Sequence, residues 1–105
     1  MENIVLNDSK IIIGNNIIEN CIITNNIIIK KYIYYLEDDS ELIIKNCIFK
    51  INNIENSNIF YCNKSKLIIE NCSFEINNLK NKKNILFYLN QGCYLEINKS
   101  KININ

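Results

Sequence analysis

The amino-acid sequence predicts an all-β fold, a single-domain parallel β-helix solenoid of about four turns with 25–28 residues per turn. The first observation behind this prediction is a recurring phrase, IIENC or IIKNC, which occurs at 17–21, 43–47 and 68–72, with a weaker copy at 96–100. A second observation is the fixed spacing of apolar residues inside each repeat. The third is a 48% hydrophobic content dominated by Ile, without Pro and with only two Gly. Such β-branched residues favour pleated, half-buried strands.

One domain covers residues 1–105, and its expected turns are approximately 1–26, 27–53, 54–78 and 79–105. Within a repeat, Leu42 and Ile44 alternate with polar or outward positions, the count slips by one to Cys47, and alternation resumes through Phe49 and Ile51. A period of two indicates a strand with one buried face. A slip of one residue indicates a corner that keeps the apolar side chains inside.

The corners are expected at asparagines, because Asn tolerates left-handed backbone angles and bonds to neighbouring backbone. The first column of corner residues is Asn20, Asn46 and Asn71, continued by Lys99. The doubled Asn at 52–53 and at 77–78 indicates a second corner. On the same alignment, Asn3-Ile4 occupies the place of Asn26-Ile27, so the N-terminal segment is expected just after such a corner.

Stacked turns bring identical side chains together at strand spacing, which predicts ladders inside the solenoid. One ladder is Cys21, Cys47 and Cys72, followed by Ser100, and another contains Phe49 and Phe74. The cysteines are expected to be small buried apolar groups with reduced thiols.

The pattern S-x-L-x-I-x-N-C-x-F-x-I-N-N, at 40–53 and 65–78, resembles the repeats of right-handed parallel β-helix proteins of the pectate-lyase-like kind. That resemblance implies a fold and leaves the function open, because the family includes polysaccharide lyases and hydrolases, viral tail and capsid proteins, adhesins and scaffolds. A rival interpretation is a leucine-rich repeat, whose strand has similar spacing. Its upstream Leu would fall at Ile13, Asp39, Lys64 and Gly92, and three of these four positions are unsuitable.

Charge and composition argue against several classes of function. Twelve Lys or Arg residues, all of them Lys, balance eleven carboxylates that are well mixed along the chain, and His is absent. Nucleic-acid binding favours clustered basic charge, so we expect no nucleic-acid partner. The acidic group Glu37, Asp38, Asp39 and Glu41 has no matching carboxylates in the next repeats and is expected to be a solvated turn. We therefore expect no catalytic constellation, no metal and no cofactor.

The compartment is indicated only indirectly. The N-terminus lacks the basic and apolar regions of a signal peptide, and no apolar run could span a membrane. Free cysteines favour a cytoplasmic or virion-associated protein, and the abundance of Ile, Asn and Lys suggests an AT-rich genome, such as that of a large DNA virus, a phage or a low-GC bacterium.

Two features suggest how the protein acts. Tyr35, Tyr61 and Tyr88 are expected to face outward as an aromatic ladder, and neither end of the solenoid has a recognisable polar cap. The leading hypothesis is a non-enzymatic structural or assembly module that packs end to end or laterally with itself or with another β-helix protein. The alternative is a carbohydrate-binding or, less favoured, polysaccharide-cleaving β-helix protein.

Overall fold

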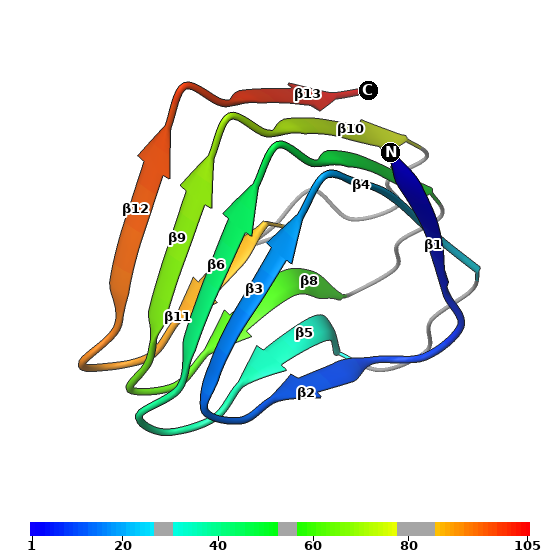
Figure 1. Ribbon diagram of the computed structural model, residues 1–105. Helices are drawn as coiled ribbons and strands as arrows, with labels where there is room; N and C mark the ends of the chain where they lie inside the picture. Colours follow the sequence, from blue (N-terminus) through cyan, green and yellow to red (C-terminus); the bar gives the residue numbers. More distant parts are fainter. Residues whose placement is uncertain (27–30, 53–56, 78–85) are drawn as a thin grey trace.

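The computed structural model describes residues 1–26, 31–52, 57–77 and 86–105, and it is a β-solenoid (Figure 1). Within these ranges the chain forms thirteen strands and no helix. Every strand pair is parallel, and the strands collect into three sheets that form the walls of the coil. The predicted fold class is therefore confirmed. Each turn contributes a strand to each of three parallel sheets, which excludes the leucine-rich repeat, whose repeat contributes a single strand.

Successive strands of one sheet come from successive turns. Sheet A contains β1 (Glu2–Leu6), β4 (Cys21–Asn25), β7 (Ile48–Asn52), β10 (Ser73–Asn77) and β13 (Lys101–Ile104). Sheet B contains β2 (Lys10–Ile12), β5 (Tyr32–Leu36), β8 (Asn58–Cys62) and β11 (Phe87–Leu89). Sheet C contains β3 (Asn15–Glu19), β6 (Glu41–Lys45), β9 (Lys66–Glu70) and β12 (Tyr94–Asn98). Four strands give three steps in sheets B and C and five strands give four steps in sheet A, close to the four turns expected.

The register of the sheets places like residues on like. Leu42 pairs with Leu67, Ile44 with Ile69 and Phe49 with Phe74. All six side chains are fully buried. The interior is thus built from columns of repeated residues, each extended by one side chain per turn.

The register of the N-terminal segment differs from the expectation. β1 lies along β4, with Ile4 opposite Ile23 and Leu6 opposite Asn25. Asn3-Ile4 therefore does not occupy the position of Asn26-Ile27, and that alignment was wrong by several residues. Burial of Leu6, which is 2% exposed, stabilises the short run Ile4–Leu6 as a strand more than a position in a turn would. As a result, sheet A has one strand more than sheets B and C at the N-terminal end of the coil.

Two columns of corner residues have left-handed backbone angles. Between sheets C and A, φ is +58° at Asn20, +54° at Asn46, +52° at Asn71 and +48° at Lys99, as the sequence predicted for this corner. The other corner, between sheets B and C, has positive φ at Gly14, Asp39, Lys64 and Gly92. Asn and Gly are the residues that adopt this conformation at least cost.

Side-chain amides connect the turns outside the sheets. Asn71 Nδ2 donates to Asn46 Oδ1 at 2.7 Å. At the far end of sheet A, Asn77 Nδ2 donates to Asn52 Oδ1 at 3.1 Å, and Asn105 Nδ2 donates to Asn77 Oδ1 at 2.6 Å. Strands β7 and β10 end at Asn52 and Asn77, where the second corner was expected, while Asn53 and Asn78 lie outside the described residues.

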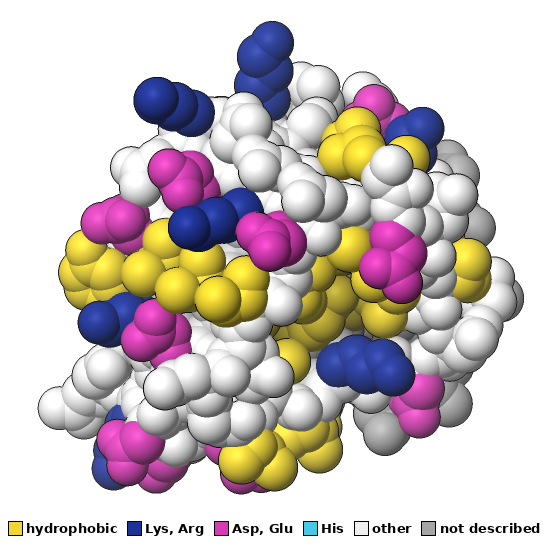
Figure 2. Space-filling view, viewed as in Figure 1, with side chains coloured by type: hydrophobic (Ala, Val, Ile, Leu, Met, Phe, Trp, Pro, Cys, Tyr) yellow, Lys and Arg dark blue, Asp and Glu magenta, His cyan; other side chains and the backbone are white. Residues whose placement is uncertain are grey.

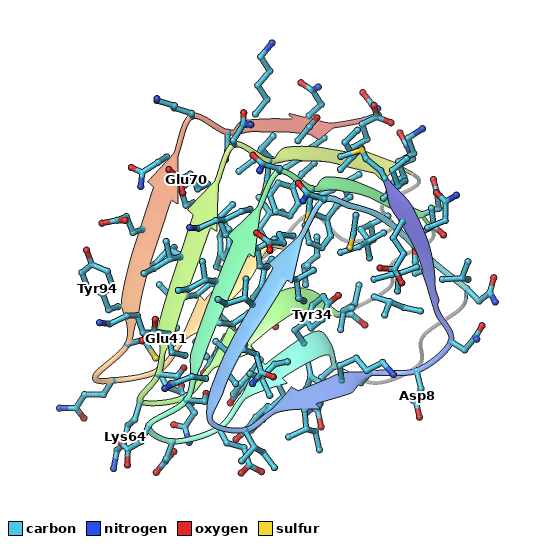
Figure 3. The ribbon with its side chains drawn as sticks, viewed as in Figure 1. Asp8, Tyr34, Glu41, Lys64, Glu70 and Tyr94 are labelled. Atoms are coloured by element: carbon cyan, nitrogen blue, oxygen red, sulfur yellow. The ribbon has the colours of Figure 1, made fainter. Side chains whose placement is uncertain are left out.

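The core is a stack of aromatic and aliphatic side chains in the middle turns. Phe49 and Phe74 stack at 4.6 Å between ring centroids, and Phe60 contacts both rings edge-on at 6.1 and 6.3 Å. Tyr34 and Phe87 continue the Phe60 column on its two sides. Figure 3 shows Tyr34 inside the coil. These contacts fix which face of each strand points inward and therefore which residues are presented to solvent.

Candidate interaction surfaces

The outer face of sheet B carries the aromatic ladder. Tyr35 pairs with Tyr61 and Tyr61 with Tyr88, and the rings stack at 5.1 and 4.6 Å between centroids. Their inner neighbours Tyr34 and Phe60 are buried, so alternation directs the ladder outward. Tyr88 is the most exposed of the three, at 40%.

Two further residues belong to this surface and were missed from the sequence. Ile11, 55% exposed, pairs with Tyr35 and extends the column by one turn. Tyr32 packs against Tyr35 and Tyr61 at 5.0 and 6.1 Å between ring centroids. The compressed first turn carries no aromatic pair, and so it gave no signal for the place of Ile11.

The stacking restricts what the ladder can bind. The planes of neighbouring rings differ by 18° and 14°, so the middle ring, Tyr61, turns its two faces toward Tyr35 and Tyr88. A sugar ring that stacks on tyrosine needs an exposed aromatic face. Tyr61 has a stacked ring on each face, Tyr35 has one face stacked on Tyr61, and the stack leaves the face of Tyr88 that points away from Tyr61. The ladder therefore favours a continuation beyond Tyr88 over a flat binding platform.

The C-terminal edge of the solenoid exposes its interior. Leu89, Ile97, Ile102 and Ile104 occupy inward columns, yet they are 45, 39, 37 and 48% exposed. Their register partners in the preceding turn are Cys62, Ile69, Phe74 and Ile76, all at most 1% exposed. The side chains of these columns are thus buried one turn earlier and exposed in the last turn. We call the four residues of the last turn the apolar edge.

The N-terminal edge is also apolar, though its inner residues are better covered. Figure 2 looks onto this end, and hydrophobic side chains line a hollow bounded by β1, β2 and β3. Leu6 and Ile12 are 2 and 9% exposed, whereas the outward-facing Ile17 is 63% exposed.

The acidic group is spread along a corner. Asp38 Oδ1 accepts a hydrogen bond from Asn63 Nδ2 at 2.6 Å, and Asp39 occupies the left-handed corner position. Asn90 follows Asn63 in this column, so amides replace the carboxylate in the next turns. Within the described residues, no group of three or more His, Cys, Asp or Glu side chains could hold a metal ion.

A shallow hollow of about 280 Å³ lies over the same corner. It is lined by Asp39, Glu41, Lys64, Lys66 and Tyr94 among others, so two carboxylates and two ammonium groups offset each other. Figure 3 places Glu41, Lys64 and Tyr94 on the outside of the coil. The Lys66 Nζ lies 5.6 Å from the centre of the Tyr94 ring. The hollow thus has no excess of one charge for selecting an ionic ligand.

The cysteine ladder is buried, and its environment does not activate the thiols. Cys21, Cys47 and Cys72 are 5, 1 and 4% exposed. Burial raises the pKa of Cys47 to about 11 and that of Cys62 to about 12, and it also raises the pKa of Cys72. Because the thiolate is the nucleophile and the metal ligand, these thiols are poor candidates for reactive groups at neutral pH. All five cysteines are unbridged.

Comparison with protein-family models, curated proteins and solved structures finds no match to this chain. The function therefore has to be argued from the geometry of the chain itself. In the part of the chain that the structure describes, no helix has the length and apolar character needed to cross a membrane.

The predicted residues thus fall into two groups. Ladder residues Asn20, Asn46, Asn71, Cys21, Cys47, Cys72, Phe49 and Phe74 lie at corners or inside the coil. Tyr35, Tyr61 and Tyr88 come together on the outer face of sheet B. The sequence predicted only that this end lacks a polar cap. It did not identify the residues of the apolar edge, because their pattern is the same as that of core residues.

Proposed function

We propose that this protein is a non-enzymatic structural module that assembles through the end of its solenoid. The observation that carries the proposal is the apolar edge, where four residues of inward columns are 37–48% exposed. The strands β11, β12 and β13 that carry them are also the outermost strands of their sheets in the described chain. An edge with unpaired backbone groups and apolar side chains is a template for further strands.

The free energy of burying the apolar edge sets the expected affinity of assembly. Burying the exposed part of each apolar-edge residue contributes on the order of 1 kcal/mol, since full burial of such a side chain is worth about 1.5–3 kcal/mol. Association itself costs at least about 4 kcal/mol in lost translational and rotational freedom. The apolar contacts alone barely offset that cost, so hydrogen bonds along the strand edges must supply the remainder. Assembly at micromolar concentrations is the expected regime.

The aromatic ladder supports the same proposal. Tyr88 ends a stack in which both faces of Tyr61 are covered, and it adjoins Leu89 of the apolar edge. A further layer that covers Leu89 also covers the outer face of Tyr88.

Carbohydrate binding along sheet B would need ring faces that the stacking occupies. On a glycan array with acidic and neutral polysaccharides, we expect no binding that depends on Tyr61. Binding by the unsubstituted protein that is lost in Tyr61→Ala would favour the carbohydrate alternative.

The mass of the protein in solution tests the proposal. Light scattering over micromolar concentrations should give a mass that rises above the 12.4 kDa of one chain. Ile97→Lys and Ile102→Lys place charge in the apolar edge and should return the protein to a monomer.

Ile68→Lys is the matched control, because Ile68 lies on the outer face of sheet C in a middle turn, and its Cα pairs with both Ile43 and Glu96. This variant should assemble like the unsubstituted protein. Circular dichroism checks that all three variants fold. A protein that stays monomeric throughout the concentration range would contradict the proposed function.

A further inference from the structure

We infer that the partner at the apolar edge is a second copy of this chain turned end for end, so that the C-terminal edges of two copies meet in a closed, tail-to-tail dimer. This inference rests on the proposed function and specifies its partner. The last coil of the described chain runs through β11, β12 and β13, which are the outermost strands of sheets B, C and A at that end. Sheet C is the middle wall, and sheets A and B extend from its two ends (Figure 1).

The shape of this edge is complementary to itself. A coil of parallel strands rises by one strand spacing, about 4.8 Å, in each turn. The edge therefore climbs from β11 through β12 to β13 and drops by one spacing between the end of β13 and the start of β11. A rotation of 180° about an axis through the middle of β12, perpendicular to the coil, gives a second edge of the same slope with its drop at the same place. All three strands then lie one spacing from a strand of the partner.

The rotation also decides which strands meet. It pairs β12 with the partner's β12 and β13 with the partner's β11, each in antiparallel orientation. A neighbour stacked head to tail in the register of the sheets would instead add its β1 to sheet A alone and leave β11 and β12 without a strand. A contact that uses the same surface of both copies closes after two of them.

The free backbone groups of β12 set the register of the central pair. Tyr94 N–H donates to a carbonyl of the preceding turn at 2.9 Å, and Asn98 O accepts from an N–H of that turn at 2.9 Å. Because this direction alternates along a strand, Leu95 and Ile97 direct their N–H and C=O groups toward the open edge. Pairing Leu95 with the partner's Ile97 joins these free backbone groups and the inward side chains together. It places Glu96 opposite the partner's Glu96 on the two-fold axis.

The flanking strands obey the same rule. In β13, Ile102 and Ile104 lie between residues whose backbone groups bond to the preceding turn, so their own polar groups face the open edge. In β11, Phe87 and Leu89 are placed alike. Antiparallel pairing sets Ile102 against the partner's Leu89 and Ile104 against the partner's Phe87. Every residue of the apolar edge thereby gains an apolar neighbour and backbone hydrogen bonds.

The lysines of the last turn do not oppose this contact. Lys99 and Lys101 lie at the corner between sheets C and A, which meets the partner's corner between sheets B and C. That corner carries Asn90, Gln91 and Gly92, which are uncharged. The lysine corners of the two copies lie at opposite ends of β12, roughly 16 Å apart for a strand of this length. This separation exceeds the Debye length of about 8 Å at physiological salt.

Glu96 on the two-fold axis is the unfavourable part of the contact, because like charges directly opposite each other are destabilising. Its carboxylate accepts hydrogen bonds from Tyr94 Oη at 2.9 Å and from Asn98 Nδ2 at 3.0 Å. Antiparallel pairing brings the same two donors of the partner to the opposite sides. These donors lower the cost of the approach, and they make Glu96 the position at which the dimer can be tested.

Cross-linking through the two-fold axis tests the inference. Glu96→Cys places two thiols opposite each other, at a Cα separation of about 4.5 Å that a disulfide can span. Cys93→Ser is made in the same protein, because Cys93 is only partly buried and Ser65 holds the equivalent place before β9. Diamide accepts two electrons and two protons as one S–S bond forms, so it should convert most of this variant into a covalent dimer.

Ile68→Cys in the same Cys93→Ser background is the matched control. Ile68 lies in the outward column of Glu96, one turn earlier. Its thiol has no symmetric neighbour in the dimer and should give only monomer on non-reducing electrophoresis.

Two measurements in solution extend the test. Light scattering of the unsubstituted protein should reach a plateau at twice the 12.4 kDa of one chain. Glu96→Gln removes the repulsion on the axis and should lower the apparent dissociation constant roughly two- to fivefold. Glu75→Gln, on the outer face of β10, should leave that constant unchanged.

The outcomes separate this inference from the proposed function. A mass that continues to rise beyond that of a dimer, or a folded Glu96→Cys variant that gives no covalent dimer, would overturn tail-to-tail pairing and retain assembly through the apolar edge. Weaker association of Glu96→Gln would also contradict a position of Glu96 on the axis. An unsubstituted protein that stays monomeric at every concentration would overturn both.

Discussion

Single residues at the corners carry a conformational cost that the choice of side chain reduces. At Asn46 the backbone has φ of +54°, and the side-chain Oδ1 accepts a hydrogen bond from Asn71 Nδ2 at 2.7 Å. A residue other than Gly or Asn at such a position is strained by roughly 1 kcal/mol. The amide of Asn46 therefore has two separable effects, tolerance of the left-handed conformation and a bond to the next turn.

Substitution of Asn46 should separate these effects. Asn46→Gly removes the hydrogen bond and keeps the backbone conformation accessible, so it should lower the free energy of unfolding by about 1 kcal/mol. Asn46→Ala adds backbone strain and should cost roughly 1 kcal/mol more. Urea denaturation followed by circular dichroism measures both. An alanine variant as stable as the glycine variant would show that the corner imposes no strain.

The serine column at the other corner offers a second comparison. Ser40 and Ser65 are 2 and 5% exposed, but Ser40 Oγ donates to the Glu37 carbonyl at 2.6 Å, while Ser65 Oγ has no hydrogen bond of ordinary geometry within the described residues and interacts only weakly with the Cys62 thiol. A buried hydroxyl without a partner is destabilising, whereas a bonded one contributes about 1 kcal/mol. Thermal unfolding should show that Ser40→Ala is destabilised and Ser65→Ala is neutral or stabilised. The reverse order would contradict this assignment.

At the scale of the strand, stability comes from the inward columns. Each strand of the middle turns places two or three side chains in the core, and each of these touches its equivalent in the turns above and below. Phe74 of β10 is fully buried, stacks on Phe49 and meets Phe60 edge-on. The outward residues of the same strand, Ser73 and Glu75, contribute no apolar column. The inward face therefore dominates the energetics of each strand.

Phe74→Ala should lower the free energy of unfolding by about 3–5 kcal/mol, because it leaves a cavity among Phe49, Phe60 and Ile102. Glu75→Ala, on the outer face of the same strand, should change it by less than about 0.5 kcal/mol. Chemical denaturation of the two variants makes the comparison. A Phe74 variant with unchanged stability would mean that the inward face has been assigned wrongly.

The stability of the whole molecule should be sensitive to alkaline pH, because buried neutral thiols lie in two of its inward columns. The pKa of Cys47 is raised to about 11 by burial, and that of Cys62 to about 12. A thiol in the unfolded chain has a pKa of about 8.5. Above that value the unfolded state loses protons that the folded state retains, so the stabilisation is complete below about pH 8.5 and declines as pH rises toward 11.

The melting temperature should accordingly fall as pH increases from about 8.5 under reducing conditions. Cys47→Ala removes one of the titrating thiols, and its melting temperature should fall less steeply over the same range. Differential scanning fluorimetry at closely spaced pH values measures both slopes. Parallel curves for the two proteins would show that the Cys47 thiol has the same pKa in the folded and unfolded states, which would contradict the prediction.

The sequence by itself determined the parallel solenoid, the position of the Asn corners and the inward columns of Cys47 and Phe49. It could do so because the turns have similar lengths, so that equivalent residues of successive repeats become neighbours in space. Only the tertiary structure decided that Glu2–Leu6 forms strand β1 under β4, since a short apolar run without the repeated phrase fits more than one register. It likewise decided that both faces of Tyr61 are covered by stacking and that Ile97 and Ile102 are exposed. Those properties depend on which neighbours a column has above and below it, and residues of one pattern can lie either in the middle of a column or at its end.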